Sequence, residues 1–168
     1  MPATQQVSEL MRQPVVAVGP GASVREVLEL AKSRGIHHVP IVQHGKLLGL
    51  VCTCDLKAAA PDLHALQLAR RNVVTASPDC SAEDAARLMM TQVVGSLLIV
   101  NGDGVWGIVT RQDLARADAE LAALLARVQC SACQSTRHLQ RGPGDTFLCA
   151  ACAERASASH WFDEGGLE

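Results

Sequence analysis

The chain repeats itself once, with a constant offset between the two copies. Residues 7–59 align with residues 65–117 without a gap, and 14 of the 53 aligned positions are identical. The identities include Gly49 with Gly107 and Asp55 with Asp113, which punctuate structure rather than fill a core. Agreement of this kind predicts two copies of one structural unit in the first two-thirds of the chain.

Each copy shows the same order of local patterns. A β-prone run is followed by a Pro-containing turn, and then by Ser23 or Ser81 with an acidic residue three positions later, which is a capping-box spacing. An amphipathic helix, two strands joined by a hairpin turn and a short helix follow. The expected elements are strands at 15–18 and 73–76, helices at 24–34 and 82–92, strands at 39–42 and 97–100, and strands at 47–52 and 105–110. The unit is therefore β-α-β-β-α, occurring twice.

Neither unit is large enough to form a good core alone, because a chain of about 50 residues buries too little of its surface. Packing the two units together buries more apolar surface, and apolar residues make up 48% of the chain. The predicted fold class is mixed α+β, with tandem β-α-β-β-α units packed as a pair and a small C-terminal module.

The ordered series of segments resembles the CBS domain pair, or Bateman module. The segments that carry this resemblance are SELM at 8–11, VVAVGPGASVREV with VVTASPDCSAEDA, HHVPIV, and GLVCTCDL with GIVTRQDL. The resemblance places CBS domain 1 at 7–60 and CBS domain 2 at 65–118. It implies that clefts between the paired domains bind adenosine-type ligands, and that two chains form a flat homodimer through their helices.

The segment GIVTRQDL, residues 107–114, combines groups that suit a nucleotide. Gly107 permits close approach of backbone or ligand. Thr110 and Arg111 add hydrogen-bond donors beside a helix N-terminus, which favours phosphate, and Asp113 can accept two hydrogen bonds from a ribose diol. The same pattern is also ordinary helix capping, and the local sequence alone favours that interpretation.

The resemblance shifts the balance towards a binding site in the second copy. It implies that Thr110 and Arg111 contact phosphate and Asp113 contacts ribose. It also implies that Thr75, Gly95 and Ser96 line an adenine pocket.

The first copy departs from this pattern. Cys52 stands at the position of Thr110, Thr53 at the position of Arg111, and Asp55 remains. Since a thiol is a weak donor, this half binds a nucleoside without phosphate, binds another ligand, or is empty.

An Ala- and Leu-rich pattern then continues to residue 128 and predicts one uninterrupted helix, with residues 119–129 as a connector. The segment 130–160 carries two C-x-x-C hooks, and their spacing is typical of tetrahedral zinc. Its predicted ligands are Cys130, Cys133, Cys149 and Cys152. We therefore predict a short zinc ribbon with structural Zn²⁺; rubredoxin-like iron, reactive dithiols and disulfides are the alternatives.

Composition argues against several classes of function. The net charge of −2 and the aromatic content of 2% do not suit nucleic-acid binding. No apolar run approaches the roughly 20 residues of a membrane span, and the N-terminus lacks the pattern of a signal peptide. The sequence therefore predicts a cytoplasmic protein without nucleic-acid or membrane partners.

The favoured function is a non-enzymatic regulatory protein that senses an adenosine-containing nucleotide such as AMP or ATP, with the zinc ribbon anchoring or signalling. No P-loop, assembled Ser-His-Asp set or open metal site supports catalysis. One alternative is a dimeric scaffold whose ribbon binds a protein partner without sensing a nucleotide. Another is redox or metal sensing through the thiols.

Overall fold

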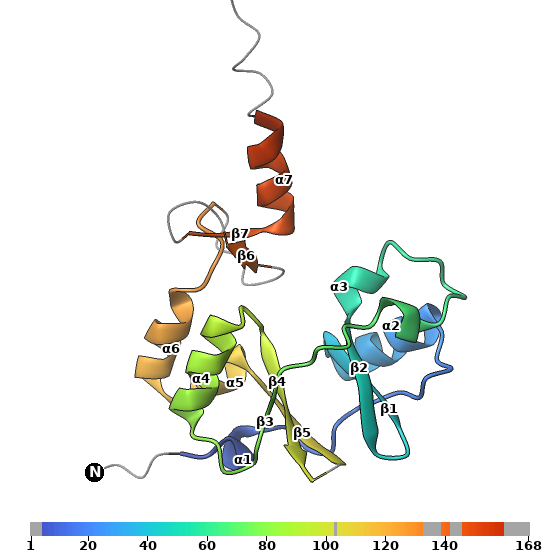
Figure 1. Ribbon diagram of the computed structural model, residues 1–168, viewed down its shortest axis with the longest axis horizontal. Coiled ribbons are helices and arrows are strands. Elements are labelled where there is room, and N and C mark those ends of the chain that lie inside the picture. The colour runs from blue at the N-terminus through green and yellow to red at the C-terminus, as the bar shows by residue number, and fades with distance from the viewer. Residues whose placement is uncertain (1–4, 103, 133–138, 142–145, 160–168) are drawn as a thin grey trace, which may run out of the picture.

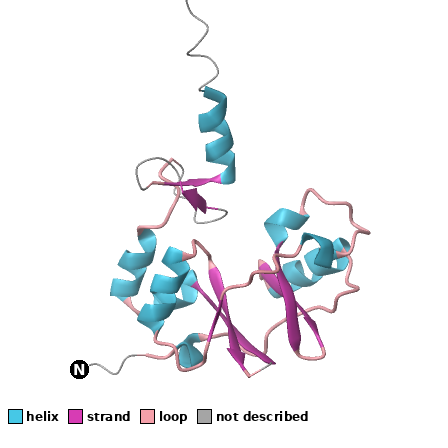
Figure 2. Ribbon diagram, viewed as in Figure 1, coloured by secondary structure: helices cyan, strands magenta, loops and turns pink. Residues whose placement is uncertain are grey.

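The computed structural model describes residues 5–102, 104–132, 139–141 and 146–159. The two repeats lie side by side, with their hairpin strands in the middle and most of their helices on the outer sides (Figure 2). The first repeat contains α2 (Val24–Arg34), β1 (His38–Gln43), β2 (Lys46–Cys52) and α3 (Thr53–Leu56). The second contains β3 (Thr75–Ala76), α4 (Ala82–Thr91), β4 (Ser96–Asn101), β5 (Gly104–Thr110) and α5 (Arg111–Ala117).

The hairpins of the two repeats have equivalent pairing. In β1 and β2, His38 lies opposite Cys52; in β4 and β5, Ser96 lies opposite Thr110. Both hairpins shift register at the same repeat position, between Ile41 and Val42 and between Ile99 and Val100. The constant offset between the copies therefore relates register as well as sequence.

The predicted first strands are mostly wrong. Residues 15–17 form no strand, and Val18 makes only an isolated parallel bridge to Ile41. In the second repeat, only Thr75 and Ala76 pair with β4. Most β-branched residues of these runs lie beside no partner strand, so their intrinsic preference for β-structure is not enough to form a strand.

The helix starts are as predicted. Ser23 and Glu26 form a complete capping box at the start of α2, and the Ser81 side chain accepts from the Asp84 N–H at the start of α4. Thr110 and Asp113 form a second capping box at the start of α5.

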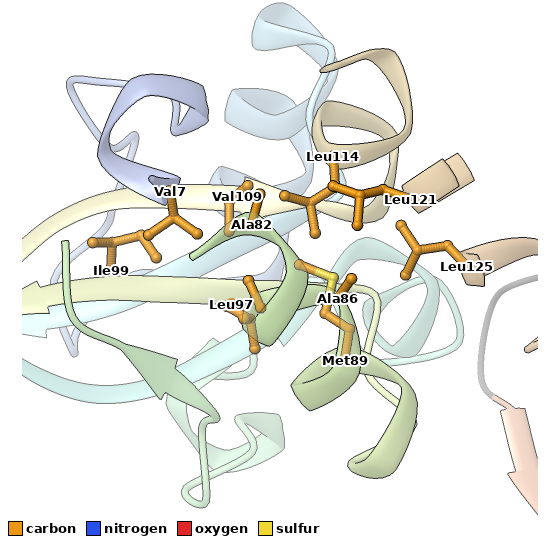
Figure 3. Close-up of a cluster of buried hydrophobic side chains, with 11 residues drawn as sticks. Val7, Ala82, Ala86, Met89, Leu97, Ile99, Val109, Leu114, Leu121 and Leu125 are labelled. Atoms are coloured by element: carbon orange, nitrogen blue, oxygen red, sulfur yellow. The ribbon is translucent and has the colours of Figure 1, made fainter. Parts of the chain in front are cut away.

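The first residues of each repeat pack in the core of the other repeat. The short helix α1 (Val7–Leu10) places fully buried Val7 in the core of the second repeat, among side chains that include Ile99 and Val109 (Figure 3). The 3₁₀ turn η1 (Ala65–Leu68) places Ala65, the repeat equivalent of Val7, in the core of the first repeat. The two units are interlocked rather than merely adjacent.

The predicted uninterrupted helix through residue 128 is wrong. Asp118 adopts an extended conformation between α5 and α6 (Ala119–Ala126), and its side chain accepts from the Glu120 and Leu121 N–H groups. The break turns α6 back onto the second repeat, so that Leu121 and Leu125 join its core. Burial of these two leucines and the Asp118 cap both favour the bent form.

The C-terminal module consists of a small antiparallel hairpin and a helix. These elements are β6 (Leu139–Arg141), β7 (Phe147–Cys149) and α7 (Ala150–Ser159). Figure 1 shows the module at one end of the molecule, beyond α6. None of the helices among the described residues has the length and apolarity needed to cross a bilayer.

Candidate functional site

A cleft of about 790 Å³ lies between the two repeats. Its lining is nearly symmetric: for most lining residues, the residue at the equivalent position of the other repeat also lines the cleft. Val16 pairs in this way with Val74, and Cys52 with Thr110. The symmetry breaks where His37 and His38 of the first repeat stand opposite Gly95 and Ser96 of the second.

The cleft is cationic. Arg12, Arg34, Arg70 and Arg111 line it, and no Asp or Glu is present among the described lining residues. Asp113 and Asp55, which lie outside the lining, offset the charges of Arg12 and Arg70. A cleft with walls of one charge sign concentrates ligands of the opposite sign. Sequence reasoning missed Arg12, Arg34 and Arg70; the identity of Arg12 and Arg70 within the repeat was the signal that could have identified two of them.

The seven residues predicted to bind nucleotide divide into two groups. Gly95 and Ser96, at the start of β4, and Thr110 and Arg111, at the end of β5 and the start of α5, line the cleft together. The other three lie outside its lining: Thr75, Asp55 and Asp113.

Asp113 is already engaged on both carboxylate oxygens. Its Oδ1 accepts from Arg12 Nε at 3.1 Å and Nη2 at 2.9 Å. Its Oδ2 accepts from the Thr110 N–H at 2.9 Å and the Thr110 hydroxyl at 2.6 Å. The Asp113 side chain is 9% exposed, so a ribose can reach this carboxylate only in exchange for one of these bonds.

The two Gly residues at matching positions are covered by protein rather than by open space. A Cβ at Gly107 would overlap the Sδ of Met11. A Cβ at Gly49 would lie 2.9 Å from the Cβ of Ala69, which is the repeat equivalent of Met11, and 3.0 Å from the Arg70 carbonyl oxygen. The close approach expected at Gly107 is therefore made by the crossing N-terminal segment.

Arg111 connects the cleft to the end of α6. Its Nη2 donates to the carbonyl oxygen of Leu125, and burial lowers the pKa of its guanidinium. The charge of Arg111 is partly buried and, among the residues that the structure describes, is balanced only by a neutral carbonyl. An anionic ligand would therefore stabilise it more than it would stabilise a fully exposed arginine.

Cys52 differs from Thr110 in chemistry as well as in size. Burial raises the pKa of the Cys52 thiol, and this effect outweighs a hydrogen bond from the Cys54 backbone that lowers it. The thiol therefore remains protonated at neutral pH and offers only a weak hydrogen-bond donor to the cleft.

Three of the four predicted zinc ligands lie together. The sulfur atoms of Cys130, Cys149 and Cys152 lie within 4.8 Å of one another, and all three residues are buried. The N–H of Ser131 donates to the Phe147 carbonyl at 2.8 Å, which holds the first hook against β7. Cys133 lies outside the described residues.

Comparison with known proteins identifies the two repeats. Residues 7–62 and 65–120 each match the model of the CBS domain. The chain belongs to the CBS domain family. The family match ends before the cysteine hooks, so it concerns the paired repeats and not the C-terminal module.

A curated relative of this chain is the uncharacterized protein MJ0188 of Methanocaldococcus jannaschii. It is 30% identical over 118 residues, which cover 68% of this chain. The match spans 44% of the length of that relative.

Solved CBS structures share the paired fold. The CBS domain pair of protein MJ0100, in complex with 5′-methylthioadenosine and S-adenosyl-L-methionine, has a TM-score of 0.64 and 27% identity and covers 68% of this chain and 95% of that one. CBSX2 in complex with AMP has a TM-score of 0.61 and 26% identity and covers 70% of this chain and 98% of that one. Both of these neighbours hold adenosine-containing ligands.

Proposed function

We propose that this CBS protein is a non-enzymatic regulatory protein that binds an adenosine-containing nucleotide in the cleft between its repeats. The cationic lining carries the proposal, because Arg34 and Arg111 form no ion pair among the described residues and suit a phosphate-bearing ligand. The adenosine-type ligands of MJ0100 and CBSX2 support the choice of nucleoside.

The second repeat supplies the principal contacts. Thr110 and Arg111 bind phosphate, while Gly95 and Ser96 leave room for the adenine ring. Asp113 binds the ribose diol after exchanging its bond to Arg12. Thr75 lies outside the cleft lining and supports β4 by pairing with Leu98.

The first repeat forms a weaker half of the site. His37 and His38 fill the positions of Gly95 and Ser96, and Cys52 replaces a hydroxyl with a protonated thiol. Asp55 faces Arg70 at 3.7 Å and is 34% exposed. We expect this half to shape the cleft rather than to hold a second nucleotide.

The C-terminal module holds structural Zn²⁺. Cys130, Cys149 and Cys152 would be three ligands, and Cys133 would be the fourth. Three buried thiols at this spacing fit a tetrahedral thiolate site, which gives a small module stability that burial alone does not supply. Metal analysis of the purified protein distinguishes zinc from iron.

The proposed assembly is a cytoplasmic homodimer. The apolar residues of α4 contribute little to a contact between two chains. Met89 is fully buried in the core of its own chain, and Leu88 and Met90 pack against the same core. Since α6 also packs against α4, contacts on this side involve the outer surface of α6. Sedimentation analysis distinguishes a dimer from a monomer.

Calorimetric titration of the full chain with AMP, ADP, ATP, adenosine and S-adenosylmethionine tests the nucleotide function. Saturable binding of at least one of these ligands is expected. The alternative, a scaffold whose ribbon binds a protein partner, predicts no heat with any of them.

A further inference from the structure

The cysteine module reaches into the cleft between the repeats. Leu139 and Gln140 of β6 and Ala150 at the start of α7 line the same cleft as the two CBS units. The cleft therefore has three walls, and the third comes from a segment that the CBS family match does not include.

The positions of these lining residues depend on the cysteine cluster. Leu139 is the cross-strand partner of Cys149, and Ala150 directly follows Cys149. Leu139 and Leu148 also pack against the three buried cysteines. Because the cluster is the module's only buried core among the described residues, holding the sulfur atoms together also holds the third wall.

A second connection joins the cleft to the first cysteine hook. Arg111 lines the cleft and donates to the Leu125 carbonyl at the end of α6. Buried Val128 and buried Cys130 follow shortly after that carbonyl along the chain. A ligand that draws the Arg111 guanidinium towards the cleft thus acts on the segment that presents Cys130.

We propose that the cysteine module is part of the ligand site, with Leu139 and Gln140 in contact with the bound nucleotide, and that metal binding by its thiols raises the affinity of the cleft. Without metal, the ligand must itself order the third wall, and that ordering cost lowers its affinity. The coupling is reciprocal, so the ligand strengthens metal binding by the same factor. This inference rests on the proposed nucleotide function.

The test compares AMP binding to the full chain loaded with zinc and to the full chain after chelation and removal of the chelator. AMP is used because ATP chelates metal ions strongly. We expect the dissociation constant for AMP to rise about tenfold in the metal-free form, a typical allosteric coupling. Competition with a chromophoric chelator should show that saturating AMP tightens zinc binding by a similar factor.

The outcomes separate the two proposals. Equal AMP affinity in both forms would overturn the coupling and leave the nucleotide function intact. Binding of zinc without binding of any adenosine ligand would overturn the nucleotide function itself. Circular dichroism of the metal-free form confirms that the CBS pair is still folded.

A variant that leaves the thiols in place tests the wall directly. Gln140→Ala should weaken AMP binding to the zinc-loaded protein several-fold without changing its zinc content. The matched control is Gln43→Ala, at the exposed end of β1 and outside the cleft lining. Equal AMP affinity of the two variants would overturn the proposed contact between the Gln140 side chain and the ligand.

Discussion

Arg12 and Asp113 join the start of one repeat to the end of the other through an ion pair of 2.9 Å. Arg70 and Asp55 occupy the equivalent positions and lie 3.7 Å apart. Each arginine lies near the start of one repeat, and its carboxylate partner lies near the end of the other repeat. The pair of contacts is therefore part of the interlocking of the two units.

Removing the two arginines should have unequal effects. Both arginines are about half exposed or more, but Asp113 is 9% exposed and Asp55 is 34% exposed, so the carboxylate of the first pair is the better shielded from water. We expect Arg12→Gln to lower the free energy of unfolding by about 1 kcal/mol and Arg70→Gln to change it very little. Urea denaturation measures both, and equal losses would contradict the assigned difference between the pairs.

Replacing Arg111 should separate phosphate recognition from nucleoside recognition. Arg111→Gln removes the charge that the cleft offers to phosphate, so AMP affinity should fall about tenfold, as expected for a charge-assisted hydrogen bond. Adenosine affinity should be nearly unchanged, and Arg116→Gln, on the exposed side of α5, is the control. Calorimetry provides both constants; a parallel loss of adenosine binding would assign Arg111 a structural role instead.

The two equivalent glycines should differ in their tolerance of a methyl group. At Gly49 the added carbon meets the Ala69 Cβ and the Arg70 carbonyl oxygen, neither of which can move without the backbone, so Gly49→Ala should cost about 1–3 kcal/mol of overpacking. At Gly107 it meets the flexible side chain of Met11, so Gly107→Ala should cost less. Thermal or urea unfolding of both variants decides, and the reverse order would contradict this explanation.

Val93 carries backbone strain that its repeat equivalent avoids. Its φ is 53°, whereas Gly35 occupies the same repeat position with φ 62°. Since a β-branched residue is disfavoured in this region by about 1–2 kcal/mol, Val93→Gly should change stability by less than about 1 kcal/mol after the entropy cost of glycine. Val94→Gly, next in the chain and packed against the core, should cost about 2 kcal/mol. Equal losses at the two positions would argue against strain at Val93.

The sequence predicted best where side chains act locally or in a repeated pattern. The capping residues Ser23 and Ser81 specify helix starts through contacts within the first helical turn, and the constant offset between the copies carries the hairpins into equivalent register. The break at Asp118 was missed because an Ala- and Leu-rich pattern is typical of a helix. The burial of Leu121 and Leu125, which favours the bent form together with the Asp118 cap, depends on distant parts of the chain.

The candidate site was harder to anticipate than the fold. The motif residues Thr110 and Arg111 were found because they are close in sequence, whereas Arg12 reaches the cleft from a position 101 residues before Asp113. The participation of Leu139 and Gln140 could not be read from local patterns, because it depends on how the C-terminal module sits against the repeats.

The exchange of Val7 and Ala65 between cores affects how the chain can be divided. If the chain is cut at the boundary between the repeats, each fragment loses a part of its own core, because that part is carried by the other fragment. A fragment that starts after residue 12 would lose Val7 from the core of the second repeat, while the core of the first repeat stayed complete. Fragments cut at the repeat boundary should thus be insoluble when produced singly and recover when produced together.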